Sequence, residues 1–391
     1  MNGTAARALD DLGVDRGMPS LDPPGQVRIP TSAMTFPSPA RSCSFLLRAF
    51  LPILWTVCAT AAEVSPAAPV DEAERGKVID GALRQLRAAY VDPDLAEKMD
   101  QAIRAELAQG YYDRFSDSRL FAAELTTKLR EICHDGHLTV AYRPVGQPEL
   151  KAAPAAPSVT VSEREREANY GFAGAQILPG NVGFLDLRSF SGVPQAGETT
   201  AAAMSFVANA DALIIDLRND LGGSADQCDR IASYLVDGRV HLYDIYGREN
   251  GKTDPHYTSA SVPGRRFGGT KPLFILTSHK TYSCAEGFAF ALRGQARVTI
   301  VGEVTGGGAH TVSERRLGEK FTIRLPAGKV IVPNLKGDWE GSGIEPDVKV
   351  AGPEALKTAH ALALEKLLAS DPARPRRAAL EQAKEAVSHN R

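Results

Sequence analysis

The sequence lacks the features that mark several common classes of protein. Its 391 residues include 45 Lys and Arg against 47 Asp and Glu, a formal net charge of −2, so it has no basic excess of the kind that binds nucleic acid. The GxxxxGK(S/T) pattern of phosphate-binding loops and the GxGxxG pattern of dinucleotide-binding folds do not occur, which disfavours a nucleotide-binding fold. No apolar run reaches the ~20 residues that a stable membrane span needs. With 43% hydrophobic and 24% charged residues, the composition is that of an ordinary globular protein.

Cysteine is scarce as well. The five cysteines divide into Cys43 and Cys58 near the N-terminus, and Cys133, Cys228 and Cys284 further along the chain. The three later cysteines cannot all pair within one chain, and no CxxC motif occurs. The sequence therefore indicates neither a disulfide framework nor a cysteine-rich zinc site.

Residues 1–61 form a predicted leader. They contain one apolar run, residues 45–59, which an arginine and a proline interrupt, and which ends at the small-x-small sequence Ala59-Thr60-Ala61. Basic residues, an apolar run and a small-residue cleavage site are typical of a secretory signal peptide. Because signal peptides begin at the N-terminus, we expect the true start at Met34 and export of the mature protein to the periplasm or out of the cell. The alternative is a disordered tail with a chance apolar patch.

Residues 72–135 are predicted to form an N-terminal helical domain. Apolar residues recur at helical spacing in three stretches, 78–90, 95–107 and 121–132, which predicts three amphipathic helices. Helices of this kind bury their apolar stripes against one another or against a neighbouring domain.

Residues 136–350 are predicted to form an α/β core. After a first strand at 138–142 and a Pro-, Ala- and Glu-rich connector at about 144–167, short β-branched runs alternate with helical stretches, which favours buried parallel strands. The expected strands are 183–187, 212–217, 273–276, 298–301, 321–325 and 330–332, and the expected helices are 225–235 and 284–292. Residues 351–391 are expected to add a closing helix, 354–368, and a charged tail.

Ser283 is the first residue with a predicted chemical role. It lies between an expected strand and an expected helix, so its hydroxyl can stand clear of the sheet while the helix N-terminus offers N–H groups to a developing oxyanion. An acyl-transfer nucleophile needs this placement. The alternative is structural, because Ser283-x-x-Glu286 is also the pattern of a capping box.

A pair of glycines follows another expected strand, in Asp216–Gly223. Gly222 and Gly223 allow backbone N–H groups to approach a ligand closely, as an oxyanion hole or an anion-binding nest requires. A tight turn leading into the next helix explains the same pattern equally well.

Histidines and one glutamate complete the candidates. His134 and His137 lie at the junction of the third helix and the first strand, where an imidazole with an ordinary pKa of about 6.5 suits a general base. Their spacing lacks the i, i+4 geometry and the glutamate of a zinc-peptidase helix, so we predict no metal site. Glu340 lies in a turn rich in glycine, from which a carboxylate can orient an imidazole. For His134, His137 and Glu340, a surface or structural role is the alternative.

Four segments together carry a resemblance to a known family. They are Asp216–Gly223, similar to DLRxNxGG, and then Thr277–Glu286, Val301–Gly308 and Gly341–Asp347. In this order, and over roughly residues 75–350, they resemble the C-terminal processing (tail-specific) serine peptidases. The Ser-Lys branch of that family has a lysine where this sequence has Gly306-Gly307-Gly308, and the connector leaves no room for its PDZ domain. The sequence is therefore more similar to the branch that contains the tricorn protease core and the repeats of interphotoreceptor retinoid-binding protein.

The resemblance implies a fold and a set of roles. The implied fold class is α/β, a crotonase/ClpP-like core of repeated β-β-α units preceded by the small three-helix domain. The implied roles are nucleophile for Ser283, base for His137, orienting carboxylate for Glu340, and oxyanion donors for the backbone N–H groups of Gly222 or Gly223 and of Cys284.

The implied function is hydrolysis of peptide bonds in peptides or unfolded proteins through an acyl-enzyme, with no cofactor. His134 and His310 compete with His137 as the base. Because the base and the nucleophile come from different domains, domain closure is expected to set their distance. Two other functions stay open, a secreted binder of apolar ligands, as the retinoid-binding members are, and a serine esterase. The oligomeric state does not follow from the sequence.

Overall fold

The computed structural model describes residues 68–143 and 163–389. The predicted leader and most of the predicted connector lie outside these residues. The last residues of the connector, Glu163–Glu167, form the short helix α4. The described residues belong to one compact unit, and all the contacts below lie within it.

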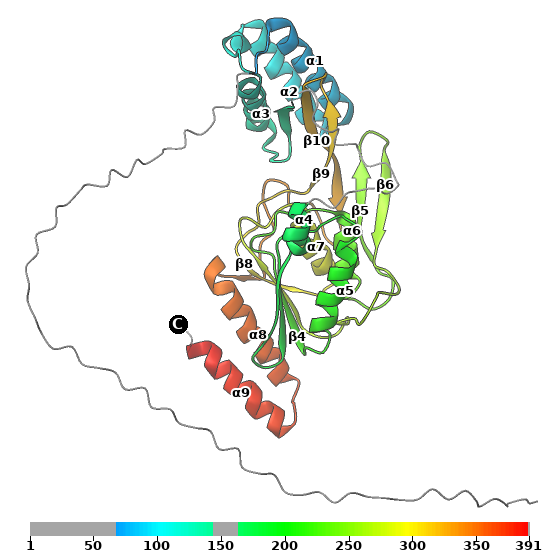
Figure 1. Cartoon of the computed structure of the whole chain (residues 1–391), viewed down its shortest axis with the longest axis vertical. Helices are drawn as coiled ribbons and strands as arrows, with labels where there is room; N and C mark the ends of the chain where they lie inside the picture. Colours follow the sequence, from blue (N-terminus) through cyan, green and yellow to red (C-terminus); the bar gives the residue numbers. More distant parts are fainter. Residues whose placement is uncertain (1–67, 144–162, 390–391) are drawn as a thin grey trace, which may run out of the picture. The chain divides into compact units, whose positions relative to one another are not determined.

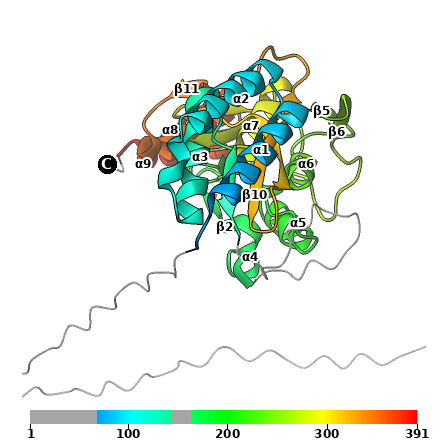
Figure 2. The same cartoon turned by 90° about the horizontal axis from the view of Figure 1, so that it is seen from above.

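Three helices make up the N-terminal part, as predicted: α1 (Glu72–Ala89), α2 (Pro93–Ala108) and α3 (Ser118–Cys133). An aspartate caps each helix, since the carboxylates of Asp71, Asp92 and Asp117 accept hydrogen bonds from backbone N–H groups of the first turn. Pro93 is the first residue of α2, where a missing N–H costs nothing. The three helices lie next to one another (Figure 2). Their apolar stripes form one buried cluster.

A six-stranded sheet forms the centre of the core, in the order β11-β8-β7-β4-β3-β2. Its strands are β2 (Phe172–Leu178), β3 (Val182–Leu187), β4 (Ala212–Asp216), β7 (Leu273–Thr277), β8 (Thr299–Gly302) and β11 (Val348–Lys349). All neighbours are parallel except β2, which pairs antiparallel with β3 at the edge. Every residue of β4 and β7 is buried, as expected for central strands covered on both faces.

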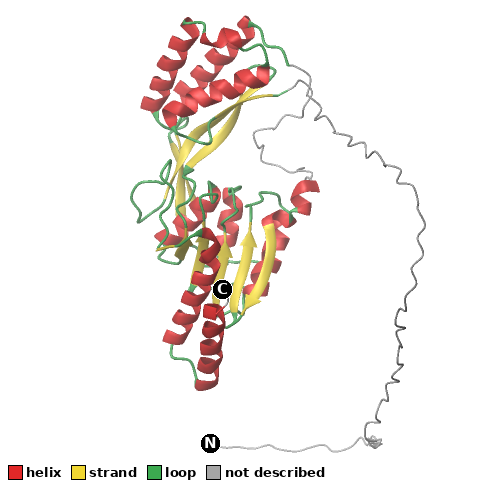
Figure 3. Ribbon diagram, turned by 90° about the vertical axis from the view of Figure 1, so that its left-hand side faces the viewer, coloured by secondary structure: helices red, strands yellow, loops and turns green. Residues whose placement is uncertain are grey.

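Helices cover both faces of this sheet (Figure 3). One face packs against α5 (Ala196–Val207), α6 (Ala225–Ala232) and α7 (Cys284–Gly294). The other face packs against α8 (Ala355–Ala369) and α9 (Arg374–His389). Helices α8 and α9 lie side by side (Figure 1). Alternate side chains of β4 divide between the two layers: Leu213 and Ile215 join the first cluster, and Ala212 and Ile214 join the second. The α/β class predicted from the sequence is confirmed.

A second, antiparallel sheet joins the helical part to the core. It consists of β1 (Thr139–Tyr142), β5 (His241–Gly247), β6 (Lys252–Tyr257), β9 (His310–Arg316) and β10 (Phe321–Ile331). The first half of β10 pairs with β1 and its second half pairs with β5. Its residues Phe321, Ile323 and Leu325 pack into the cluster of the three N-terminal helices. A single strand, β10, therefore contacts both parts of the molecule.

A disulfide joins Cys228 of α6 to Cys284 of α7, and Cys133 is a buried free thiol. The sequence did not predict this pairing, because the two cysteines are separated by 56 residues and no local pattern links them. None of the helices in the described ranges is both long and apolar enough to cross a bilayer.

Candidate active site

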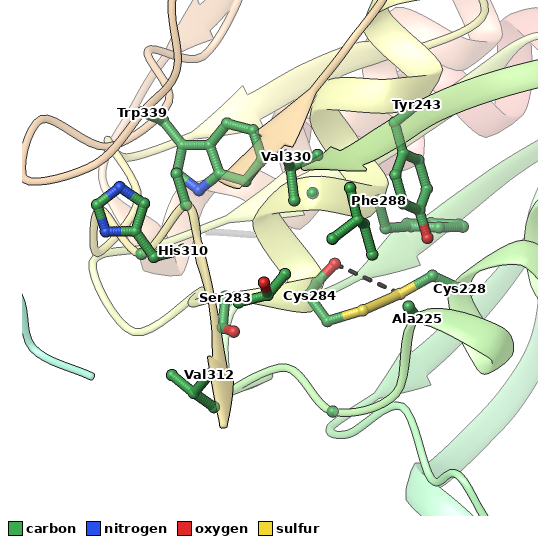
Figure 4. Close-up of a pocket in the computed structure, with 16 residues that line it drawn as sticks. Ala225, Cys228, Tyr243, Ser283, Cys284, Phe288, His310, Val312, Val330 and Trp339 are labelled. Atoms are coloured by element: carbon green, nitrogen blue, oxygen red, sulfur yellow. Dashed lines mark hydrogen bonds between the residues drawn. A yellow bond between two sulfur atoms is a disulfide. The ribbon is translucent and has the colours of Figure 1, made fainter. Parts of the chain in front are cut away.

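Ser283 lies at the turn that joins β7 to α7, where the sequence predicts it. Its backbone has φ 56° and ψ −121°, a conformation that costs a residue with a side chain of the order of 1–3 kcal/mol. Ser283 also lines a cavity of about 300 Å³ (Figure 4). The turn therefore places a serine at the N-terminus of a helix and in the wall of a cavity.

Glu286 holds this turn in place. Its carboxylate is fully buried and accepts hydrogen bonds from the backbone N–H of Ser283 at 2.7 Å, from Thr305 Oγ1 at 2.5 Å and from the backbone N–H groups of Gly307 and Gly308 at 2.8 Å. Burial raises its pKa, although these hydrogen bonds act in the opposite direction. The capping interaction foreseen for Ser283 and Glu286 thus extends to the glycine-rich loop, whose Gly308 also lines the cavity.

The paired glycines pack directly against the serine turn. Gly222 has φ +97°, and a Cβ placed on it would lie 2.8 Å from the backbone nitrogen of Cys284 and 3.0 Å from Ser283 Cβ. Gly223 has φ +147°, so both positions favour glycine. The N–H of Gly222 donates to the buried carboxylate of Asp220 at 2.7 Å, and burial raises the pKa of Asp220. Of the two glycine N–H groups, that of Gly223 is therefore the better candidate for an oxyanion donor.

The cavity beside Ser283 is mainly apolar. Its wall includes the Cys228–Cys284 disulfide and the side chains of Tyr243, Ile245, Phe288, Val330 and Trp339 (Figure 4). The hydroxyl of Tyr243 donates to Asp229 at 2.8 Å, which satisfies that polar group. A site of this kind accepts an apolar side chain.

A cluster of two histidines and two carboxylates lies next to the serine turn. Asp135 is at its centre and is fully buried. Asp135 Oδ1 accepts the backbone N–H of His137 at 2.9 Å, and Oδ2 lies 2.7 Å from Nδ1 of His310. The structure therefore brings together His137, His310 and Glu340, which are separated in sequence, around one carboxylate.

His137 packs against the residue that precedes the serine. Its ring centroid lies 4.8 Å from that of Tyr282, and its Nδ1 lies 3.3 Å from the Tyr282 hydroxyl. Its Nε2 is buried and has no hydrogen-bond partner among the described residues. His134, by contrast, is an exposed residue at the C-terminus of α3, with φ 54°.

His310 lines the same cavity as Ser283 (Figure 4). Glu340 contacts the segment that carries it, because Glu340 Oε2 accepts the backbone N–H groups of Ala309 at 2.6 Å and of His310 at 3.1 Å. The same oxygen lies 3.5 Å from Nδ1 of His310. Glu340, chosen from the sequence as a carboxylate that orients an imidazole, is thus in contact with His310.

Burial and charge act against each other in this cluster. Burial alone would raise the pKa of Asp135, but hydrogen bonds with His137 and His310 and the charge of His310 hold it well below its usual range. Burial alone would lower the pKa of His310, but the hydrogen bond to Asp135 and the negative charges of Glu340 and Asp135 raise it. The pKa of Glu340 is raised, first by burial and then by the charge of Asp135. Asp135 is therefore the fixed negative charge of the cluster.

The cluster also has the composition of a metal site. Asp135, His137 and Glu340 each offer a ligand atom, and these atoms lie within 4.8 Å of one another. Both oxygens of Asp135 already take part in hydrogen bonds with histidines, and we assign no metal ligands here.

Sequence reasoning did not assign a role in the site to Asp135, and gave Glu286 only a cap. The signal for Asp135 is its position in Asp135-Gly136-His137, two residues before a candidate histidine. The signal for Glu286 is its position in the first turn of the helix that follows Ser283.

Comparison with known proteins identifies the family of the core. Residues 181–350 match the family model described as peptidase family S41. This region belongs to that family, in agreement with the resemblance to C-terminal processing peptidases.

Similar proteins include carboxyl-terminal-processing peptidase 1 of Arabidopsis thaliana chloroplasts, 27% identical over 43% of this chain and 33% of that protein. Carboxy-terminal processing protease CtpA of Bacillus subtilis is 25% identical over 47% of this chain and 38% of that protein. The chain thus matches only about a third of the length of these relatives. Among solved structures, a lipoprotein from Streptococcus agalactiae has the same fold, with a TM-score of 0.51 and 15% identity over 77% of this chain and 98% of that one.

Proposed function

We propose that this protein is a serine peptidase that cleaves peptide bonds of peptides or unfolded proteins through an acyl-enzyme on Ser283. The observation that carries the proposal is the position of Ser283, in a strained turn at the N-terminus of α7, in the wall of an apolar cavity that His310 also lines. Membership of the core in a serine peptidase family supports it.

In the proposed reaction, Ser283 Oγ attacks the scissile carbonyl carbon and a histidine of the cluster takes its proton. The resemblance assigns this role to His137, with Glu340 as the orienting carboxylate. The histidine then gives the proton to the leaving amine, and water releases the acyl group by the same steps. The reaction needs no metal and no organic cofactor.

The oxyanion of the tetrahedral intermediate needs fixed N–H donors. The backbone N–H of Cys284, in the first turn of α7, and that of Gly223 are the proposed donors, since Gly222 donates to Asp220. Each such donor is worth about 3–4 kcal/mol in other serine hydrolases.

The cavity suggests which substrates fit. Because Phe288, Trp339 and Ile245 line it, we expect cleavage after residues with an apolar side chain. A panel of matched peptide and ester substrates distinguishes a peptidase from an esterase. Binding of a fluorescent lipid without turnover of either substrate would indicate the apolar-ligand carrier instead.

The test of the nucleophile is labelling with a fluorophosphonate probe under native conditions, followed by peptide mapping. We expect an adduct on Ser283 and none in Ser283→Ala. Ser342→Ala, which changes an exposed serine outside the cavity, is the matched control and should label like the unchanged protein. A folded protein without an adduct on Ser283 contradicts the proposal.

We also propose that the protein is exported, with residues 1–61 removed as a leader. The apolar run and the small residues Ala59-Thr60-Ala61 support this.

A further inference from the structure

Asp220 is a buried carboxyl group in the loop of the paired glycines, and the proposed reaction gives it no role. Resting on the proposed function, we propose that Asp220 acts as a neutral carboxylic acid that positions the glycine turn, and that the peptidase loses activity when this group ionises. Asp220 is thus a positioning residue for the oxyanion donors, and it makes catalysis sensitive to alkaline pH.

Asp220 lies between the glycine loop and the serine turn. Its Oδ1 accepts the backbone N–H of Gly222 at 2.7 Å, and its backbone oxygen accepts the N–H of Tyr282 at 3.0 Å. Tyr282 directly precedes the proposed nucleophile. One residue therefore contacts both of the segments that supply the proposed oxyanion donors, the N–H groups of Gly223 and Cys284.

The hydrogen bond to Asp220 helps to fix the chain on either side of Gly223. Gly222 is buried; its N–H donates to Asp220, and its backbone oxygen accepts the N–H of Phe190 at 3.0 Å. On the other side, the N–H of Ser224 donates to the backbone oxygen of Phe190 at 2.8 Å. Gly223 itself is exposed and lines the cavity. Its N–H can therefore serve the substrate while its neighbours hold the loop.

The surroundings of the Asp220 carboxyl favour the neutral acid. The group is fully buried, and its Oδ2 has no hydrogen-bond partner among the described residues. A buried carboxylate with one N–H donor and no cation beside it is costly, so such a group keeps its proton. Burial accordingly raises the pKa of Asp220 well above its ordinary value, although the hydrogen bond from Gly222 acts in the opposite direction.

The charged groups around Asp220 leave a negative charge on it without compensation. The charge of Asp186, in β3, raises the pKa of Asp220 further. Two neighbouring arginines already form bidentate pairs, Arg218 with Asp216 and Arg188 with Asp186. The other titratable groups of the adjoining segments are those of the serine turn and of the start of α6: His279, Lys280, Tyr282, Glu286 and Asp226. The two cationic candidates among them, His279 and Lys280, are exposed.

Ionisation of Asp220 would act on the reaction through its charge. The tetrahedral intermediate carries a negative oxygen at the donors of the two segments that Asp220 contacts. Loss of the Asp220 proton to solvent adds a second negative charge in the same buried loop, where like charges oppose each other more strongly than in water. Attack by Ser283 is therefore disfavoured, and the rate should fall as the pH rises through the raised pKa of Asp220.

The conservative variant follows from the sequence. The motif DLRxNxGG, which Asp216–Gly223 resembles, has asparagine at the position of Asp220. Asparagine keeps an oxygen that can accept the N–H of Gly222, but it cannot ionise. Asp220→Asn therefore preserves the positioning and removes the response to pH.

The first test compares pH profiles between about pH 5 and about pH 10, for reaction with the fluorophosphonate probe and for turnover of an apolar peptide. In the unchanged protein, both rates should fall by about 10-fold or more on the alkaline side. Asp220→Asn should lose this alkaline limb and keep the acid limb, which belongs to the histidine base. Asp371→Asn, which changes an exposed aspartate paired with Arg377, should match the unchanged protein throughout. An alkaline limb that persists in Asp220→Asn, or that is absent from the unchanged protein, overturns the proposal.

A second variant tests the positioning role. Asp220→Ala removes the acceptor of the Gly222 N–H together with the ionisable group. We expect a loss of about 10²-fold at every pH, as on removal of one oxyanion donor, whereas Asp220→Asn should retain the rate of the unchanged protein at its pH optimum. Equal rates in the alanine and asparagine variants would contradict the positioning role.

A measurement of stability tests the protonation of Asp220 without any activity. The folded protein keeps a proton that the unfolded chain loses above the ordinary pKa of about 4, so the unchanged protein loses stability as the pH rises toward the raised pKa. Relative to the unchanged protein, the urea midpoint of Asp220→Asn should rise over this pH range and then stay constant. A difference in midpoint that does not vary with pH overturns the proposal. If the unchanged protein does not react with the probe, the proposed function fails, while the urea midpoints still decide whether Asp220 is neutral in the folded protein.

Discussion

Among single residues, Gly222 has no room for a side chain beside the serine turn. Replacing it with alanine would place a Cβ 2.8 Å from the backbone nitrogen of Cys284 and 2.9 Å from the backbone oxygen of Tyr282. Since backbone atoms on the serine turn must move to make room, we expect Gly222→Ala to lower kcat/KM by about 10²-fold or more, the loss that follows removal of one oxyanion donor. Peptide hydrolysis and probe labelling measure this.

Gly238→Ala is the matched control. Gly238 also has a positive φ, +78°, but no atom lies within 4 Å of its added Cβ. Both variants lose about 1 kcal/mol of stability from the left-handed backbone, and only Gly222→Ala should lose activity. Equal activity in the two variants would show that the packing of Gly222 against the turn does not matter for catalysis.

Glu286 is the residue on which the shape of the serine turn depends. The Glu286 carboxylate accepts four hydrogen bonds. In Glu286→Gln an NH2 group replaces one of its two oxygens, so at least one of these hydrogen bonds is lost. Because these donors are buried, we expect a loss of about 1–3 kcal/mol in the free energy of unfolding, measured by urea denaturation, together with slower labelling of Ser283.

The control for Glu286 is Glu345→Gln, which changes an exposed glutamate paired with Lys349. Surface ion pairs of this kind contribute little to stability. The free energy of unfolding of Glu345→Gln should therefore stay within about 0.5 kcal/mol of that of the unchanged protein. If Glu286→Gln is no less stable than Glu345→Gln, the hydrogen bonds of Glu286 do not hold the turn.

At the scale of elements, α6 and α7 form one wall of the cavity. Ala225 is the first residue of α6 and lines the cavity (Figure 4), so Ala225→Leu should fill part of it. We expect kcat/KM for substrates with a large apolar side chain to fall about 10-fold or more relative to substrates with alanine there, while labelling by the small probe persists.

Ala202→Leu, on the exposed side of α5, controls for the added apolar surface. It should leave unchanged the ratio of kcat/KM between substrates with a large apolar side chain and substrates with alanine. A preference that does not change in Ala225→Leu would mean that the substrate side chain occupies a different cavity.

The success of the sequence predictions also differs from element to element. The strands β4 and β7 were predicted because they are apolar throughout and buried on both faces. The single strand β10 was predicted as two, because Pro326 and Gly328 interrupt its pattern; the structure accommodates them at an irregularity in the pairing with β9. The polar strand β9 was not predicted, because its residues HTVSERR become a strand only through pairing with β10.

The same distinction applies to the site. Ser283 and the glycine pair follow from local motifs at the ends of strands, which sequence alone displays. The contact between Asp135 and His310 joins residues 175 positions apart, at the start of a strand that was not predicted. The available signal was the glycine run Gly306–Gly308, which ends two positions before His310, since a loop that approaches the nucleophile closely also carries the side chains that follow it close to the site.

In the whole molecule, the helical part is attached to the core through β10 and through Arg248, which directly follows β5. Val91 donates to the backbone oxygen of Pro326 at 2.9 Å, and the guanidinium of Arg248 donates to the backbone oxygens of Tyr90 and Arg87. The domain closure expected from the sequence would therefore have to bend the β9–β10 hairpin, which begins at His310.

Export is also a property of the whole chain. If residues 1–61 are a leader, the mature protein should begin near Ala62, as N-terminal sequencing of the exported protein would show. Ala61→Tyr should block cleavage and Ala67→Tyr, beyond the cleavage site, should not. A protein that begins near Met1 in the cytosolic fraction would contradict export.

The long separation between His137 and Glu340 has a consequence for the order of synthesis. A chain made from its N-terminus contains His137 long before Ser283, and Glu340 comes later still. Contacts so distant in sequence form late in folding. No partial chain contains the whole relay, so the nascent protein could not cut itself, or the machinery that makes and moves it, until its last third has been made and folded.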